Sequence, residues 1–162
     1  MGDIIKVGMA DLKVAATTDD VLITLGLGSC IGIALYDPSI KLGGLAHIML
    51  PDSTKIKNNT NIAKFADTGI DELIRLMVAK GANKSRLVAK IAGGAKMFEV
   101  SSSTSIGNVG ENNAVASRDR LKYHGIRLLA EDTGLNYGRT VELHCDNGSY
   151  VIKAVGKPLK TI

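Results

Sequence analysis

The apolar run Val21–Leu25, with the turn that follows it, constrains the fold of this chain more than any other stretch. The run is typical of a strand, and it ends in the segment Gly26-Leu27-Gly28-Ser29-Cys30. Glycines at a strand end let the backbone turn sharply and approach a bound group closely. The sequence therefore predicts a strand that delivers the Cys30 thiol on a tight turn, flanked by backbone N–H groups.

Composition predicts a single domain spanning residues 1–162. The hydrophobic share of 45% and the charged share of 22% are ordinary for a globular protein, and 18 glycines favour a sheet-rich fold. The net charge of +4 comes from scattered lysines, so we expect no nucleic-acid partner. No apolar run is long enough to cross a membrane, and two distant cysteines without an export signal indicate a cytoplasmic location.

The order of elements predicts a mixed α+β chain. A polar loop is expected at 53–61, a helix from Thr60 or Asn61 to Gly81, and a serine-rich linker at 101–105. Asn147-Gly148 is typical of a hairpin turn. The three consecutive strands at 21–25, 31–36 and 42–50 are expected to form one antiparallel meander. Cys30 then lies at the start of the second of these strands and His47 near the end of the third. Strands are predicted within 4–14 and at 21–25, 31–36, 42–50, 86–92, 126–130, 139–145 and 150–155, and a second helix at 113–124.

Cys30 is the candidate nucleophile, although a lone cysteine is often only a small buried hydrophobe. A thiol needs a base near neutral pH, and the chain has three histidines. His144 neighbours Cys145 in a strand, where successive side chains point to opposite faces, and His124 ends a helix, where it suits the dipole. His47 lies in an otherwise apolar strand, either as a satisfied core residue or as the base for Cys30.

A third polar residue can complete the arrangement. Thr24, in the strand before the turn, can orient the His47 imidazole through its hydroxyl or its carbonyl, and it is also an ordinary strand residue. Backbone N–H groups near Gly28 and Ser29 can stabilise an oxyanion. The third glycine of a dinucleotide-binding motif is missing, and no metal-ligand spacing occurs, so we expect neither a cofactor nor a metal.

Five motifs in series resemble the CheD family, the chemoreceptor glutamine deamidases of bacterial chemotaxis. They span nearly the whole chain in the order of that family. The motifs are Thr24–Cys30, Gly44–Ser53, Phe65–Thr68, Lys90–Phe98 and Glu131–Arg139.

The resemblance implies a mainly antiparallel or mixed β-sandwich flanked by two helices, similar to the catalytic domain of deamidating toxins. It implies hydrolysis of glutamine side chains on the cytoplasmic regions of chemoreceptors, with Cys30, His47 and Thr24 as the catalytic triad. It also implies binding to the phosphatase CheC, and we expect Phe98 in that contact because the chain has only two phenylalanines.

The chain departs from the family pattern at Leu135, where a glycine is usual, and at Asn112, near which an arginine is expected. Neither position belongs to the predicted triad. Two other functions stay open from the sequence. One is a non-catalytic module that regulates receptors or CheC by binding, and the other is hydrolysis of receptor methyl esters by the same thiol.

Overall fold

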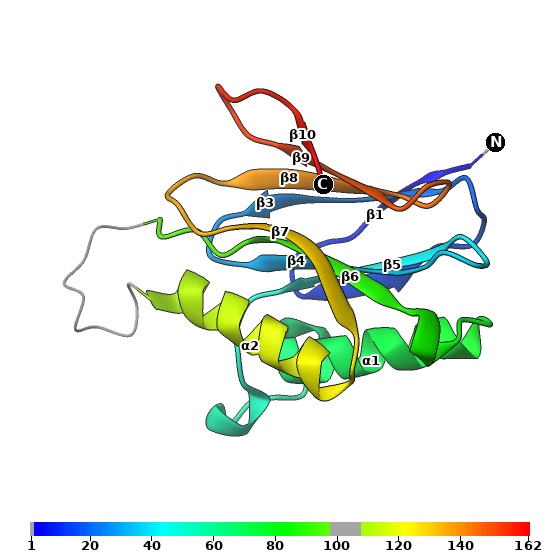
Figure 1. The fold of residues 1–162 in the computed structure, drawn as a ribbon. Helices are drawn as coiled ribbons and strands as arrows, with labels where there is room; N and C mark the ends of the chain where they lie inside the picture. Colours follow the sequence, from blue (N-terminus) through cyan, green and yellow to red (C-terminus); the bar gives the residue numbers. More distant parts are fainter. Residues whose placement is uncertain (1, 98–107) are drawn as a thin grey trace.

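The computed structural model describes residues 2–97 and 108–162. Within them, two five-stranded sheets pack face to face, and two helices cover the outer face of one sheet (Figure 1). This arrangement confirms the predicted α+β sandwich flanked by two helices. None of the described helices is long and apolar enough to cross a membrane. Phe98 and the serine-rich segment 101–105 lie outside the described residues.

The first sheet has the strand order β1-β3-β8-β9-β10, with β1 parallel to β3 and the other pairs antiparallel. Asp146, Asn147 and Gly148 form the predicted turn between β8 and β9, and Gly148 adopts a φ of 76°. The short β10 was not predicted. The strands are β1 Ile4–Lys6, β3 Val21–Leu27, β8 Arg139–His144, β9 Ser149–Lys153 and β10 Lys160–Thr161.

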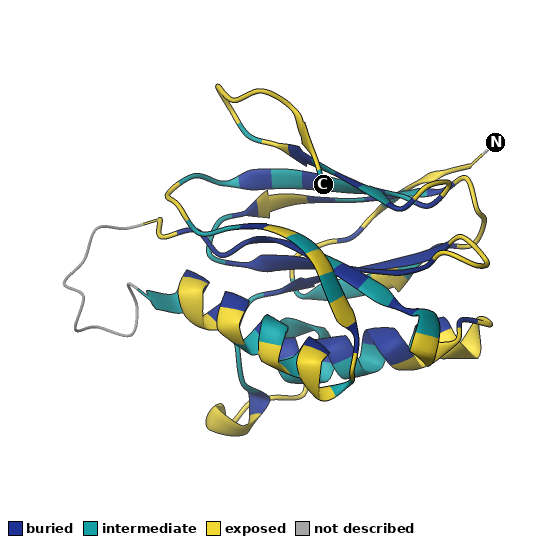
Figure 2. Ribbon diagram, in the orientation of Figure 1, coloured by how far each residue is buried: buried dark blue, intermediate teal, exposed yellow. Residues whose placement is uncertain are grey.

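The second sheet has the order β2-β5-β4-β6-β7, with β6 and β7 parallel and the rest antiparallel. The strands are β2 Asp11–Val14, β4 Ile31–Asp37, β5 Leu42–Ile48, β6 Val88–Gly93 and β7 Arg127–Thr133. Every residue of β4 and β5 is buried, since the first sheet covers one face of this sheet and the helices cover the other (Figure 2). That double burial explains their nearly continuous apolar sequences.

The predicted three-strand meander is wrong in one respect. β4 and β5 pair antiparallel as expected, but β3 belongs to the other sheet. The chain changes sheets at the glycine turn, where Gly26 takes a φ of 72° and the register of β3 shifts between Thr24 and Leu27. A turn of this kind redirects the strand out of its sheet, so the β3 side chains face β5 across the sandwich instead of pairing beside it.

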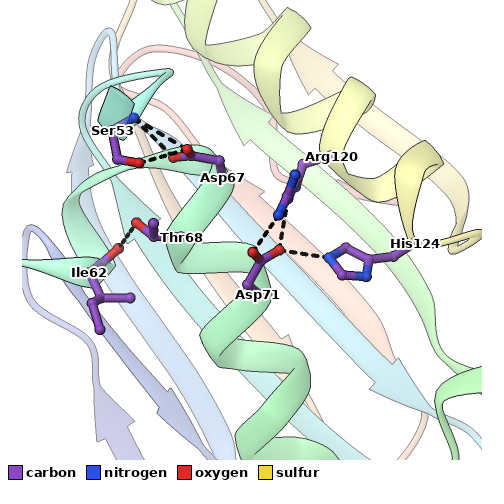
Figure 3. Close-up of polar contacts among 7 residues, drawn as sticks. All are labelled: Ser53, Ile62, Asp67, Thr68, Asp71, Arg120 and His124. Atoms are coloured by element: carbon purple, nitrogen blue, oxygen red, sulfur yellow. Dashed lines mark hydrogen bonds and ion pairs between the residues drawn. The ribbon is translucent and has the colours of Figure 1, made fainter. Parts of the chain in front are cut away.

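Two helices pack against the second sheet, α1 Ala66–Ala79 and α2 Val109–Tyr123. Both predicted helices are present, but Asn61 caps the preceding 3-10 turn Ile62–Lys64 instead of α1. Further side-chain hydrogen bonds order this region (Figure 3). The Asp67 side chain accepts from the Ser53 backbone N–H and hydroxyl, and Asp71 on α1 binds Arg120 and His124 on α2. These contacts fix the helices relative to each other beside the loop that follows β5.

Candidate active site

Strand register brings Cys30 and His47 onto one face of the second sheet. In the β4–β5 pair, Gly32 lies opposite His47. Side chains alternate along a strand, so Cys30, two residues before Gly32, points to the same side as His47. The two residues are therefore diagonal cross-strand neighbours, a separation that side chains can bridge. The antiparallel pairing predicted for the strands at 31–36 and 42–50 is confirmed by this register.

The shared face points into the space between the sheets. A Cβ atom on Gly32 would lie 2.7 Å from the Tyr150 hydroxyl of the first sheet, so glycine makes room for that ring. The Tyr150 hydroxyl donates to the Gly32 carbonyl at 2.9 Å. Cys30 is 8% exposed and His47 is fully buried. The thiol and the imidazole thus lie just below the surface, at the edge of a packed core.

Thr24 reaches His47 from the opposite sheet. Its Oγ1 lies 2.7 Å from His47 Nδ1 and donates its proton to the Val7 carbonyl, also at 2.7 Å. Because the hydroxyl has only one proton, it must accept a hydrogen bond from Nδ1. His47 therefore carries its proton on Nδ1 and keeps the lone pair on Nε2, the atom a general base uses. It is the Thr24 hydroxyl, not its carbonyl, that contacts the ring.

The environment keeps both reactive groups uncharged. Burial lowers the pKa of His47 below its ordinary value of 6.5, and burial raises the pKa of the Cys30 thiol, partly opposed by its own backbone N–H. His47 Nε2 is buried and has no hydrogen-bond partner among the described residues. A neutral imidazole with an unpaired lone pair, on the same sheet face as a neutral thiol, can act as a general base toward that thiol, taking its proton as sulfur attacks.

The turn that carries Cys30 is held by its carbonyl groups. The Gly28 carbonyl accepts from Ala95 N–H and the Cys30 carbonyl from Gly94 N–H, each at 2.8 Å. The Gly28 N–H already donates to the Gly26 carbonyl at 3.0 Å. In the described part of the chain, no backbone or side-chain oxygen accepts from the N–H groups of Ser29 and Cys30, and the Cys30 N–H acts on its own thiol. Both groups can donate to an oxyanion at this turn, whereas the Gly28 N–H already has an acceptor.

The other histidines and the second cysteine lie elsewhere. His124 binds Asp71 at 2.7 Å, and His144 lies 3.2 Å from Glu142 on the same strand. Cys145 is fully buried, and its pKa is raised to about 11 by burial. No group of His, Cys, Asp and Glu side chains in the described part of the chain could hold a metal ion.

Two residues beside the site were missed by the sequence analysis. Val7 contributes only a backbone carbonyl, which no sequence pattern reveals. Asn113 on α2 is fully buried and donates from Nδ2 to the carbonyls of Ser29 and Met49. Its signal was a polar residue at helical spacing from Gly110, Ser117 and Leu121, three of the other buried positions of α2.

Comparisons with known proteins agree with these motifs. The profile described as CheD chemotactic sensory transduction matches residues 49–154, beginning two residues after His47. A protein of Lachnoclostridium phytofermentans is 59% identical over 162 residues, all of both chains, and one of Caldanaerobacter subterraneus subsp. tengcongensis is 52% identical over 98% of each. Both relatives are named probable chemoreceptor glutamine deamidase CheD.

The fold also resembles that of a solved structure. A Neisseria meningitidis protein of the DUF152 family superposes with a TM-score of 0.53 and 11% identity, over 82% of this chain and 64% of that one. This likeness concerns the fold alone. The extent of the profile match and the full-length identity of the relatives show that the chain belongs to the CheD family.

Proposed function

We propose that this chain is a protein-glutamine glutaminase that converts glutamine side chains of chemoreceptors to glutamate. The observation that carries the proposal is the contact between Thr24 and His47, which leaves Nε2 unprotonated on the same sheet face as Cys30. A relative that is identical at 59% of positions over the full length is named for this activity. The geometry and the family therefore support the same chemistry.

The reaction follows from the placement of these groups. His47 Nε2 takes the proton of Cys30 Sγ as the sulfur attacks the carboxamide carbon. The N–H groups of Ser29 and Cys30 donate to the oxyanion that forms. His47 then gives the proton to the departing ammonia, leaving a thioester on Cys30. The same nitrogen then takes a proton from water as the water attacks the thioester carbon. The imidazole gives this proton to the departing sulfur of Cys30, and the glutamate side chain is released.

The proposal extends to the setting of the enzyme. We infer that residues 1–162 form one catalytic domain that acts in the cytoplasm on the cytoplasmic regions of chemoreceptors. Binding of the phosphatase CheC is part of the same proposal and follows from the family. The Phe98 contact remains a prediction, because this residue lies outside the described chain.

The test is mass spectrometry of a receptor cytoplasmic fragment after incubation with the protein. We expect glutamine-to-glutamate conversion with the wild type, and none with Cys30→Ala. Cys145→Ala is the matched control, since it removes the other buried cysteine, and it should convert glutamine as the wild type does. Conversion by Cys30→Ala would contradict the proposed nucleophile. Binding of the receptor fragment without conversion by any variant would favour the non-catalytic module.

A further inference from the structure

We propose that Asn113 is a positioning residue that locks the nucleophile turn to the end of the strand carrying the base. The inference rests on the deamidase function proposed above, and it assigns a role to a residue of α2 outside the proposed triad. The side-chain amide of Asn113 lies at the point where the two halves of the site meet.

The geometry is a two-pronged clamp made by one nitrogen atom. Asn113 Nδ2 donates to the Ser29 carbonyl and to the Met49 carbonyl, each at 2.9 Å. Ser29 immediately precedes the nucleophile, and Met49 follows the base by two residues. Each of the two N–H protons of the amide thus holds one backbone segment, and the distance between those segments sets the approach of Cys30 to His47.

The buried amide is held as a donor. Asn113 is fully buried, and its Oδ1 is buried without a partner among the described residues. An unpaired buried oxygen costs stability, whereas the nitrogen makes both of its hydrogen bonds. An apolar residue at this position would avoid that unpaired oxygen, but it would leave the carbonyls of Ser29 and Met49 without this donor. The asparagine is therefore explained by the two carbonyl groups that it holds in place.

Close backbone packing brings α2 to this position. A Cβ atom on Gly110 would lie 2.5 Å from the carbonyl oxygens of Gly94 and Ala95, so only glycine allows the first turn of α2 to approach so closely. The N–H groups of Gly94 and Ala95 bind the carbonyls of Cys30 and Gly28. The start of α2 therefore rests on the segment that grips the turn, and Asn113 lies one helical turn further on.

If Asn113 acts as this clamp, its loss should lower turnover and leave substrate affinity nearly unchanged. Without the amide, the turn and the strand end move independently, and Cys30 Sγ is no longer held toward Nε2. Displacement of reacting groups by about 1 Å can lower the rate about 100-fold. For Asn113→Ala we expect kcat to fall about 100-fold, while KM for the receptor fragment changes less than about threefold.

A readout independent of turnover is the alkylation of Cys30 by iodoacetamide as a function of pH, measured in Cys145→Ala protein. We expect Asn113→Ala to slow alkylation about tenfold at neutral pH and to raise its midpoint by about one pH unit, because the thiol loses its base. Asn113→Ser keeps one donor and should lie between the wild type and alanine. Ser117→Ala is the matched control, since it removes a fully buried hydroxyl one turn later on α2 that donates to the Asn113 backbone carbonyl and leaves the Asn113 side-chain amide intact.

A purely structural role would give a different pattern. In that case Asn113→Ala and Asn113→Ser would lower the melting temperature while the folded protein kept the wild-type kcat and alkylation profile, and this result would overturn the proposal. If the alanine variant does not fold, the serine variant decides between the two patterns. If wild-type protein deamidates nothing, the deamidase proposal fails, and the alkylation profiles still show whether Asn113 positions the thiol.

Discussion

The Thr24 hydroxyl offers the sharpest test of the geometry, because one substitution of nearly equal volume removes it. In Thr24→Val the Val7 carbonyl loses its donor and His47 Nδ1–H loses its acceptor, and both are buried with Thr24 at 0% exposure. An unpaired buried polar group costs about 1–3 kcal/mol, so for these two groups we expect the free energy of unfolding to fall by about 2–6 kcal/mol. Urea unfolding followed by circular dichroism measures this loss.

The same substitution should lower activity more than a general loss of stability would. Without the hydroxyl, nothing holds the proton on Nδ1, and the ring can turn or place its proton on Nε2, where it cannot act as a base. Loss of the correct histidine tautomer in a serine protease lowers kcat by about 10⁴, and we expect at least about 100-fold here. Thr24→Ser keeps both hydrogen bonds and should retain most of the activity. Equal losses in the valine and serine variants would refute the role of the hydroxyl.

Three further predictions concern pH, the nucleophile turn and the helix pair. Because burial lowers the pKa of His47, kcat/KM should rise with pH through a midpoint below 6.5, and a midpoint above 6.5 would contradict this. As pH falls below 6.5, the wild type should lose unfolding free energy with a slope of at most about 1.4 kcal/mol per pH unit, and His47→Gln should flatten this loss. Gly93→Ala places a Cβ 2.2 Å from the Cys30 carbonyl at a φ of 112° and should abolish deamidation. Gly125→Ala, at a φ of 72° with nothing within 4 Å, should lower the free energy of unfolding by only about 1–2 kcal/mol. Equal effects of the two variants in thermal melts and assays would refute the packing argument. Asp71→Asn weakens partly exposed ion pairs between the helices and should lower stability by about 1 kcal/mol, leaving turnover within about twofold. A larger loss of activity would link these pairs to the site.

The sequence predicted the strands of the site because their patterns are local. The apolar run before the glycine turn, the Asp37-Pro38 turn and the buried strand around His47 each appear within a few residues, and the β4–β5 pairing follows from them. The sheet to which β3 belongs could not be predicted in this way. An apolar strand of this length suits either sheet of a sandwich, and the change of sheet depends on the backbone at Gly26.

The supporting contacts were harder to predict, since they join distant segments through backbone atoms. The Val7 carbonyl and the grip of Gly94 and Ala95 on the turn involve groups that every residue carries. The buried position of Asn113 could not be predicted for another reason. The buried face of α2 is built largely from small residues, so no apolar stripe marks the position as internal.

Leu135 also takes a φ of 60°, a conformation that favours the glycine usual in the family.

The most direct test of the central claim is to trap the acyl-enzyme. The protein and a receptor cytoplasmic fragment are mixed, quenched in acid during turnover and analysed by intact-mass and peptide mass spectrometry. We predict a covalent adduct of the two chains, lighter than their sum by one ammonia, attached at Cys30 and released by hydroxylamine. An adduct at Cys145, or undiminished deamidation by Cys30→Ala with no adduct at all, would contradict the account.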